Sequence, residues 1–368
     1  MRLIPVMRPR LPATERLVPY LTKIDETRIY TNHGPLVRAF EGRLAEHFSL
    51  APGSVTAVAN ATLGLALALA AQGPQPGTLC IVPAWTFVAT AHAAVMAGLI
   101  PYFVDVDTKT WTLDPDRIDE EIARAPGPVS AVVPVAAFGQ PVDVAAWDRL
   151  RSRTGLAVVI DAAAGFDSLR PGATPAVVSL HATKVVGVGE GGFVACTDVS
   201  LIRSVRSRAN FGFHRARQAV TPAVNAKLSE YHAAVGLAAL DEWATVREEW
   251  MGLARAYRAA LPDSGRLRFQ DGFGESWIAS TCMLTMPHVG VERVAQALTA
   301  AGIDTRRWWG DGAHAHPATA AYPRSPLPVT EALARTAIGV PLYRDLAVSD
   351  VQRIADVVLA VGARVTDC

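Results

Sequence analysis

Lysine is scarce in this 368-residue chain, which has only Lys23, Lys109, Lys184 and Lys227. Arginine supplies the other 31 of its 35 basic residues. Unlike arginine, lysine can lose its proton near neutral pH and attack a carbonyl group. The few lysines are therefore candidates for chemistry as well as for surface charge.

The chain also lacks a strong net charge and long apolar runs. Its formal net charge is +1, so we expect no attraction to nucleic acid or to a membrane surface. The most apolar stretch, residues 57–71, is shorter than the roughly 20 residues that cross a membrane. The basic start, Met1–Arg10, is not followed by an uninterrupted apolar segment, so we expect no signal peptide.

Cysteines are few and do not cluster. Cys80, Cys196, Cys282 and Cys368 lie far apart, without the spacing of a metal site, and are typical of thiols in a reducing compartment. His314 and His316 lie close together, but we identify no cysteine or carboxylate at metal-binding spacing from them. We therefore expect a cytoplasmic protein and predict no metal site.

The composition is that of a folded chain of two domains. Half of the residues are hydrophobic and 19% are charged, which excludes disorder. The length exceeds one ordinary core, and we detect no internal repeat. We place a large domain at 1–245 and a small C-terminal domain at 246–368.

Short apolar strands alternate with helices in the large domain. We expect strands at 55–59, 79–82, 101–106, 131–135, 157–160, 176–180 and 192–196, and helices at 13–29, 36–48, 88–97, 198–209 and 228–243, the last continuing through 245–260. This alternation predicts a parallel or mixed α/β sheet with helices on both faces. Residues 214–224 lack periodicity and are predicted to be a loop. Beyond 262, a strand at 282–286 and helices at 291–301, 329–338 and 348–361 predict a smaller α+β domain.

Lys184 and Asp161 are the first candidate site residues. Lys184 follows an apolar run and precedes a glycine-rich segment, and Asp161 closes a strand 23 residues earlier. Both should lie at the carboxyl edge of the sheet, where ligands bind in such folds. Each has an ordinary alternative: Lys184 as a solvated surface lysine, and Asp161 as a helix N-cap.

Other candidates follow neighbouring strands. The segment Asn60-Ala61-Thr62 leads from a strand into a helix and suits an anion, although small residues there also serve close packing. Ser179 can bind a phosphate or merely end a strand, and Phe87 can stack on a flat ring or fill the core. His181 fits a packing role or a position behind the residues that contact a ligand. Together these residues fit pyridoxal 5'-phosphate (PLP), which needs a phosphate cradle, a stacking face, a carboxylate for its ring nitrogen and a lysine for its aldehyde.

The chain resembles the DegT/DnrJ/EryC1/StrS family of sugar aminotransferases almost from end to end. The resemblance rests on Thr31–Pro35, Asn60–Leu65, Pro83–Thr90, Pro101–Asp107, Phe138–Pro141, Asp161–Ala163, Ser179–Lys184, Gly189–Gly192, Asn210–Phe213 and Asn225–Leu228. It is strongest to the branch that aminates C4 of nucleotide-linked 4-keto-6-deoxyhexoses. It implies the PLP fold type I, with a mostly parallel seven-stranded sheet between helices and a small α+β domain.

The resemblance also implies roles for particular residues. Lys184 binds the cofactor's aldehyde covalently and moves protons, and Asp161 holds the pyridine nitrogen. The remaining cofactor contacts are Ala61, Thr62, Phe87, Ser179 and, from the other subunit of a homodimer, Asn225. Substrate contacts are assigned to Thr31, His181, Glu190, Arg306 and Trp309. The implied substrates are L-glutamate and a nucleotide-linked ketosugar.

Two positions depart from the family pattern. Ala164 stands where the family usually has Gln or His beside the cofactor, and Ala61 replaces a glycine in the phosphate turn, which is tolerable only if its φ is negative. Three alternatives remain beside C4 amination: a C3 aminotransferase, a PLP-dependent sugar dehydratase and a non-catalytic protein of the same fold. The dehydratases have His at the lysine position, so Lys184 argues against that alternative.

Overall fold

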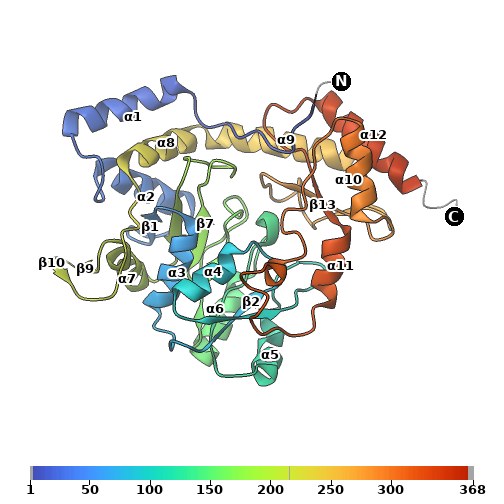
Figure 1. Ribbon diagram of the computed structural model, residues 1–368. Helices are drawn as coiled ribbons and strands as arrows, with labels where there is room; N and C mark the ends of the chain where they lie inside the picture. The colour runs from blue at the N-terminus through green and yellow to red at the C-terminus, as the bar shows by residue number, and fades with distance from the viewer. Residues whose placement is uncertain (1–2, 215, 364–368) are drawn as a thin grey trace.

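The computed structural model describes residues 3–214 and 216–363, and Figure 1 shows their arrangement. Cys368, predicted to be a free thiol, lies outside the described residues. The other three cysteines are buried and free. No helix in the described part of the chain is long and apolar enough to cross a membrane.

The centre of the molecule is a mostly parallel sheet of seven strand positions. Its order is β1-β8-β7-β6/β5-β4-β2-β3, and only β8 runs antiparallel to its neighbours. The strands are β1 (Val55–Val58), β2 (Leu79–Pro83), β3 (Ile100–Val104), β4 (Val129–Val132), β5 (Ala157–Val158), β6 (Ile160–Asp161), β7 (Ala176–Ser179) and β8 (Gly192–Ala195). The predicted seven-stranded sheet is thereby confirmed.

The segments β5 and β6 occupy one strand position that is interrupted at Val159. The N–H groups of Val159 and Asp161 donate to Val132 and Pro134, which keeps the strand beside β4 and its extension. This continuity joins the two halves of the sheet. It also carries Asp161 to the carboxyl end of the strand.

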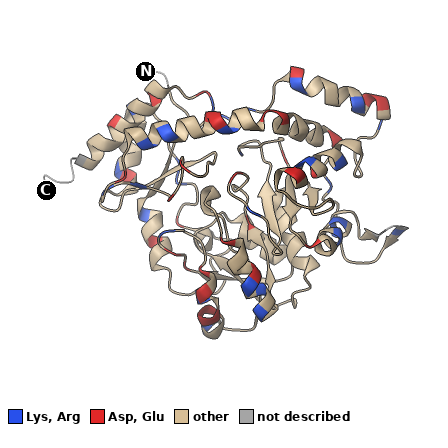
Figure 2. Cartoon of the chain, turned by 180° about the vertical axis from the view of Figure 1, so that it is seen from behind, with Lys and Arg blue, Asp and Glu red and all other residues tan. Residues whose placement is uncertain are grey.

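Helices cover both faces of the sheet, because alternate strand residues point to opposite sides. Ile81 packs in the same core cluster as Phe40 and Trp147, whereas its neighbours Cys80 and Val82 pack in a second cluster. The helices are α1 (Thr14–Thr27), α2 (Pro35–His47), α3 (Ala61–Ala71), α4 (Ala89–Met96), α5 (Ile118–Arg124), α6 (Val144–Thr154), α7 (Val199–Ala209) and α8 (Glu230–Asp241). Charged residues lie mainly on the outer helices and loops, whereas the central strands are largely uncharged (Figure 2).

Polar residues mark where several of these helices begin. The side chains of Asn60, Asp143, Asp198 and Ser229 each accept a hydrogen bond from an N–H in the first turn of α3, α6, α7 and α8 respectively. Such caps satisfy donors that have no carbonyl partner within the helix. They therefore help to fix the residue at which each of these helices begins.

The C-terminal part is a smaller α+β unit beside α9 (Trp243–Ala260). It contains the antiparallel strands β11 (Arg268–Phe269), β12 (Cys282–Thr285) and β13 (Ala337–Val340), and the helices α10 (Val291–Ala300), α11 (Pro328–Thr336) and α12 (Val348–Ala363). Near the amino terminus, Ile4 forms a bridge with Ile303 of this unit. The domain boundary near residue 245 stays a prediction.

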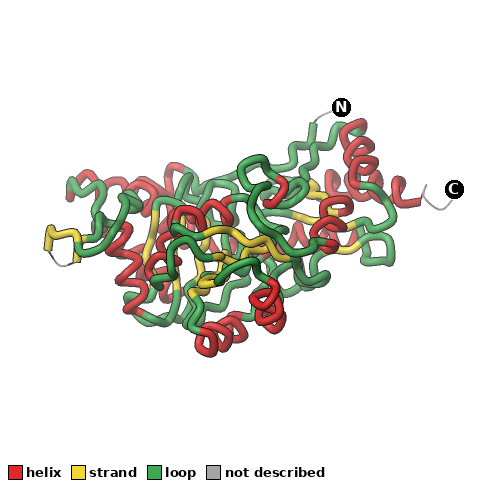
Figure 3. The backbone as a smooth tube through the Cα atoms, turned by 60° about the horizontal axis from the view of Figure 1, so that its bottom comes forward, coloured by secondary structure: helices red, strands yellow, loops and turns green. Residues whose placement is uncertain are grey.

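Two sequence predictions were wrong in detail. Part of the predicted loop instead forms two paired antiparallel strands, β9 (Phe213–His214) and β10 (Ala216–Ala219), and Figure 3 shows these strands projecting from the edge of the molecule. The predicted helix 329–338 ends at Thr336, and β13 follows it. The strands β9, β10 and β13 each form through pairing with a neighbouring strand, which the periodicity of apolar residues does not report.

Candidate functional site

A cavity of about 600 Å³ opens at the carboxyl ends of the central strands. It brings together most of the predicted site residues: Ala61, Thr62, Phe87, Asp161, Ser179, His181, Lys184, Glu190, Arg306 and Trp309. These residues come from both the large sheet and the C-terminal part. The cavity is therefore the candidate active site.

Asp161 lies at the base of the cavity with 5% of its surface exposed. Its Oδ2 accepts a hydrogen bond of 2.7 Å from the Thr90 hydroxyl, and its Oδ1 accepts one of 3.1 Å from the Ala163 N–H. Burial raises the pKa of the Asp161 carboxyl, and these two bonds and the nearby Lys184 oppose that rise. No helix begins at Ala163, so Asp161 does not serve as an N-cap.

Lys184 lines the same cavity, on the turn that follows β7. Its backbone N–H donates to the carbonyl of His181, which holds the turn closed. Burial lowers the pKa of the Lys184 ammonium, whereas the Asp161 carboxylate opposes that shift. A lysine whose proton is held less tightly is suited to attack on a carbonyl carbon.

An anion cradle lies at the amino end of α3. Asn60 caps the helix through the Leu63 N–H, and the next residues, Ala61 and Thr62, line the cavity with first-turn N–H groups that have no partner within a helix. Ser179 adds a hydroxyl from the end of β7. Ala61 is the first residue of α3 and does not have a positive φ, so its methyl group causes no backbone strain.

Phe87 is 60% exposed and lines the cavity, so it is not a core residue. A second aromatic group forms another wall. The rings of Phe138 and Trp309 stack with their centroids 3.8 Å apart, and Trp85 meets Trp309 edge to face. Phe138 adopts a left-handed backbone with φ of 54°, a conformation that bulky residues rarely adopt outside functional or strained sites.

His181 and Glu190 lie at the cavity with Thr183. The Thr183 N–H donates to His181 Nδ1, so in the neutral ring the proton is on Nε2, which lies 3.6 Å from Glu190 Oε1. His181 therefore presents a donor toward a carboxylate. His181 is partly exposed and lines the cavity.

The neighbouring arginines 306 and 307 have different surroundings. The guanidinium of Arg306 lies over the ring of Trp308 at 4.8 Å, and Arg306 lines the cavity. Arg307 instead pairs with Asp311 at 2.5 Å and with Glu292 at 3.7 Å. Only Arg306 is thus placed to meet a ligand in this cavity.

Two predicted site residues lie outside the cavity. Thr31 is exposed in the turn before α2. Asn225 is exposed, forms a backbone bridge with Asn210, and accepts a hydrogen bond of 2.6 Å from Lys227. In this single chain neither residue contributes to the cavity wall.

Sequence reasoning missed Thr86 and Thr281, which line the cavity, and Thr90, which binds Asp161 without lining the cavity. A signal for the two threonines was available, since Thr86 and Thr90 follow a strand and are four residues apart, as on one helix face. No local pattern marked Thr281, which reaches the cavity only through the packing of the C-terminal part. Ala164 lines the cavity and contributes only a methyl group.

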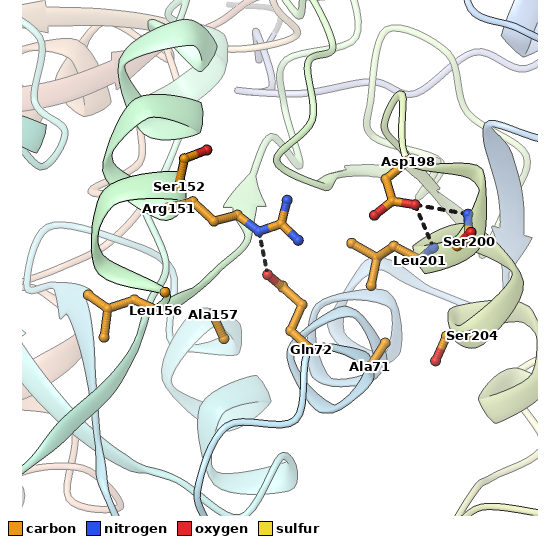
Figure 4. A pocket seen from close by; sticks show the side chains of 11 residues that line it. Ala71, Gln72, Arg151, Ser152, Leu156, Ala157, Asp198, Ser200, Leu201 and Ser204 are labelled. Carbon is orange, nitrogen blue, oxygen red and sulfur yellow. Dashed lines mark hydrogen bonds between the residues drawn. The ribbon is translucent and has the colours of Figure 1, made fainter.

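A second cavity, of about 490 Å³, lies beside the start of β5 and contains none of these residues (Figure 4). Its two charged side chains, Arg151 and Asp198, already have structural partners. Arg151 donates to Gln72 Oε1 and to the Ala173 carbonyl, and Asp198 caps α7 through two N–H groups. Among the described residues, no group of three His, Cys, Asp or Glu side chains could hold a metal ion.

The donor set of the first cavity fits PLP. The free N–H groups of α3 with Thr62 and Ser179 suit a phosphate, the exposed Phe87 offers a stacking face, and Asp161 and Lys184 supply the carboxylate and the amine. A mostly parallel sheet with this constellation at its carboxyl edge defines a PLP-dependent aminotransferase of fold type I.

The model of the DegT/DnrJ/EryC1/StrS aminotransferase family matches residues 13–359, and the chain belongs to this family. It is similar to a dTDP-4-amino-4,6-dideoxy-D-glucose transaminase of Shigella dysenteriae, at 34% identity over 70% of each chain. A UDP-2-acetamido-2-deoxy-3-oxo-D-glucuronate aminotransferase of Pseudomonas aeruginosa is 29% identical over 84% of this chain and 86% of its own. The structure of DesI with its TDP-sugar product has a TM-score of 0.88 at 30% identity, covering 99% of this chain and 94% of that one.

The predictions of fold, enzyme class and cofactor are thereby confirmed. The chain is a PLP-dependent sugar aminotransferase.

Proposed function

We propose that the enzyme transfers the amino group of L-glutamate to a nucleotide-linked keto-deoxysugar, at C4 of a dTDP-4-keto-6-deoxyhexose. The observation that carries the proposal is that Lys184 and Asp161 line one cavity together with the anion cradle. The names of the Shigella relative and of the DesI complex support the nucleotide-linked sugar. We expect the enzyme to act in the cytoplasm.

In this proposal, different residues of the chain move protons and hold the cofactor. When bound, PLP supplies an electrophilic aldehyde carbon and a ring that accepts electron density. Lys184 takes the Cα proton from the amino donor and returns a proton to the sugar carbon in the second half-reaction. Asp161 holds the proton on the ring nitrogen, and the α3 cradle with Ser179 holds the phosphate.

The aromatic wall, Arg306, His181 and Glu190 are assigned to the substrates. Arg306 can bind an oxyanion of a substrate through two parallel N–H groups, and its guanidinium lies over the ring of Trp308 at the cavity. Arg307 serves as a matched control, since it already pairs with two acidic side chains. We expect Arg306→Gln to raise the KM of a substrate at least tenfold and Arg307→Gln to leave it within twofold.

A second subunit completes the site in this proposal. Tyr30, Phe211, Val224 and Tyr231 each expose 40% or more of their surface around Asn225, which supports burial of this face against another copy of the chain. The projecting strands β9 and β10 follow directly from Phe211 (Figure 3). Asn225 then contacts the cofactor phosphate of the other subunit, and Thr31 contacts the substrate.

The test assays the amino donor, L-glutamate, and the ketosugar acceptor in separate steps. L-glutamate alone should bleach the absorbance of the lysine-bound cofactor, and a panel of dTDP-, UDP- and GDP-linked ketosugars should restore it. NMR of the amino sugar product then identifies the aminated carbon. Amination at C3 favours the alternative that the Pseudomonas relative supports. No bleaching by glutamate and no amino sugar from any acceptor would contradict the proposal.

A further inference from the structure

Two buried threonines form a chain of hydroxyl groups that ends on Asp161. Thr86 and Thr90 are 1% and 0% exposed. The Thr90 hydroxyl lies 2.7 Å from Asp161 Oδ2, and the hydroxyls of Thr86 and Thr90 lie 2.9 Å apart. Thr86 also lines the cavity. The chain thus runs from the cavity wall to the carboxylate.

The direction of these hydrogen bonds follows from the charge of Asp161. An ionised carboxylate only accepts, so the one hydroxyl proton of Thr90 is donated to Oδ2. The Thr90 oxygen then accepts from Thr86. The Ala163 N–H occupies Oδ1, so both oxygens are held in place while the carboxylate keeps lone pairs for a further donor.

We propose that Thr90, supported by Thr86, is a positioning residue that keeps the buried Asp161 carboxylate ionised and fixed in orientation for the cofactor's ring nitrogen. The inference rests on the proposed role of Asp161. Burial favours the neutral carboxyl, and Lys184 is the charged group that opposes this effect. Lys184 must also react, whereas a threonine hydroxyl does not titrate and stabilises the carboxylate throughout the reaction.

The test measures PLP binding to the apoprotein at neutral pH, without any substrate. Thr90→Val should weaken PLP binding about tenfold, because hydrogen bonds to charged groups are strong, and Thr90→Ser should restore most of it. Thr174→Val is the matched control, since Thr174 is also buried and its hydroxyl has no partner within the described residues. Equal PLP affinity in Thr90→Val and the wild type would overturn the inference.

A second measurement separates positioning from simple packing. Removing the Thr90 hydroxyl raises the pKa of Asp161 further. The free energy of unfolding of the Thr90→Val apoprotein should therefore fall below that of the wild type by a small amount near pH 4 and by a larger amount as the pH rises. A purely structural role predicts a loss that does not vary with pH. In an Asp161→Asn background, Thr90→Val should have no further effect on PLP affinity.

These readouts also separate the inference from the proposed function. If the enzyme aminates no sugar but Thr90→Val still weakens PLP binding, the function fails and the inference stands. If amination occurs and Thr90→Val binds PLP normally, the inference alone fails.

Discussion

At the scale of single residues, two buried ionisable side chains determine the chemistry that we propose for the cavity. Lys184 and Asp161 each have a pKa shifted by burial toward the neutral form, and each opposes the shift of the other. This mutual dependence suits a site in which the lysine must lose its proton while the carboxylate stays charged. Ala164, by contrast, adds only a methyl group to the cavity wall.

Lys184→Ala should abolish turnover and the absorbance of the lysine-bound cofactor. The loss follows because, within the described part of the chain, no other lysine lines the cavity. Absorbance spectra and an assay of the amino sugar product measure both effects. Lys109→Ala, at an exposed position, is the control and should retain full activity. A Lys184→Ala enzyme that kept both signals would refute the assignment.

His33 makes stability depend on pH. Both of its ring nitrogens are buried without a hydrogen-bond partner among the described residues. Burial, followed by the charges of Arg206, Lys227 and Arg38, lowers the pKa of His33 to about 4. The unfolded chain takes up a proton near pH 6.5, so the folded state loses stability as the pH falls from there toward 4.

His33→Asn should remove this acid sensitivity. Asparagine tolerates the left-handed backbone of this position, where φ is 55°. Between pH 8 and pH 5, the wild type should lose about 2 kcal/mol in free energy of unfolding through His33, and the variant should not show this loss. Denaturant unfolding at the two pH values measures the change. His288→Asn, at an exposed position, should leave the pH dependence unaltered.

At the scale of the elements, close packing between helices holds the large sheet's covering layer in place. The ring of Phe40 in α2 lies against Gly236 in α8, where an added Cβ would come within 2.6 Å of it. The amino end of α2 is also tied to α8, because the carboxylate of Glu230 accepts from the Leu36 and Val37 N–H groups. Packing and hydrogen bonds therefore join the two helices into one layer.

Gly236→Ala should destabilise the protein, whereas Gly252→Ala should stabilise it. The first places a methyl group against the Phe40 ring and should cost about 1–3 kcal/mol. The second lies in α9 with nothing within 4 Å of the added Cβ and should contribute about 0.5–1 kcal/mol through helix propensity. Equal effects of the two substitutions on the free energy of unfolding would contradict this account.

At the scale of the whole molecule, the cavity is assembled from parts that are far apart in the chain. The carboxyl ends of the central strands supply the residues that we propose to hold the cofactor, and the C-terminal part supplies Arg306, Trp308 and Trp309. The exposed apolar face around Asn225 lies outside this cavity. In our proposal, a second copy of the chain covers this face and completes the site.

Mixing two inactive variants tests this arrangement. Lys184→Ala and Asn225→Ala subunits, mixed and allowed to exchange, should recover up to about a quarter of wild-type activity, because each mixed dimer has one site with both native residues. Neither variant alone should approach that activity. Activity that stays at the sum of the separate variants would exclude a shared site that needs Asn225.

Much of this architecture could be predicted from the sequence. The apolar runs of the strands and their alternation with helices predicted the sheet, because strands buried on both faces require continuous apolar residues. The positions of Asp161, Ser179 and Lys184 after successive strands predicted their convergence. Parallel strands present their carboxyl ends at one edge, so spacing along the chain sufficed.

Only the tertiary structure decided the rest. The bond between Thr90 and Asp161 joins residues 71 positions apart, and the different surroundings of Arg306 and Arg307 depend on which acidic side chains pack beside them. The strands β9, β10 and β13 likewise exist through pairing rather than periodicity. Local sequence determines propensity and the burial pattern, whereas a polar group's partner depends on which distant elements share its space.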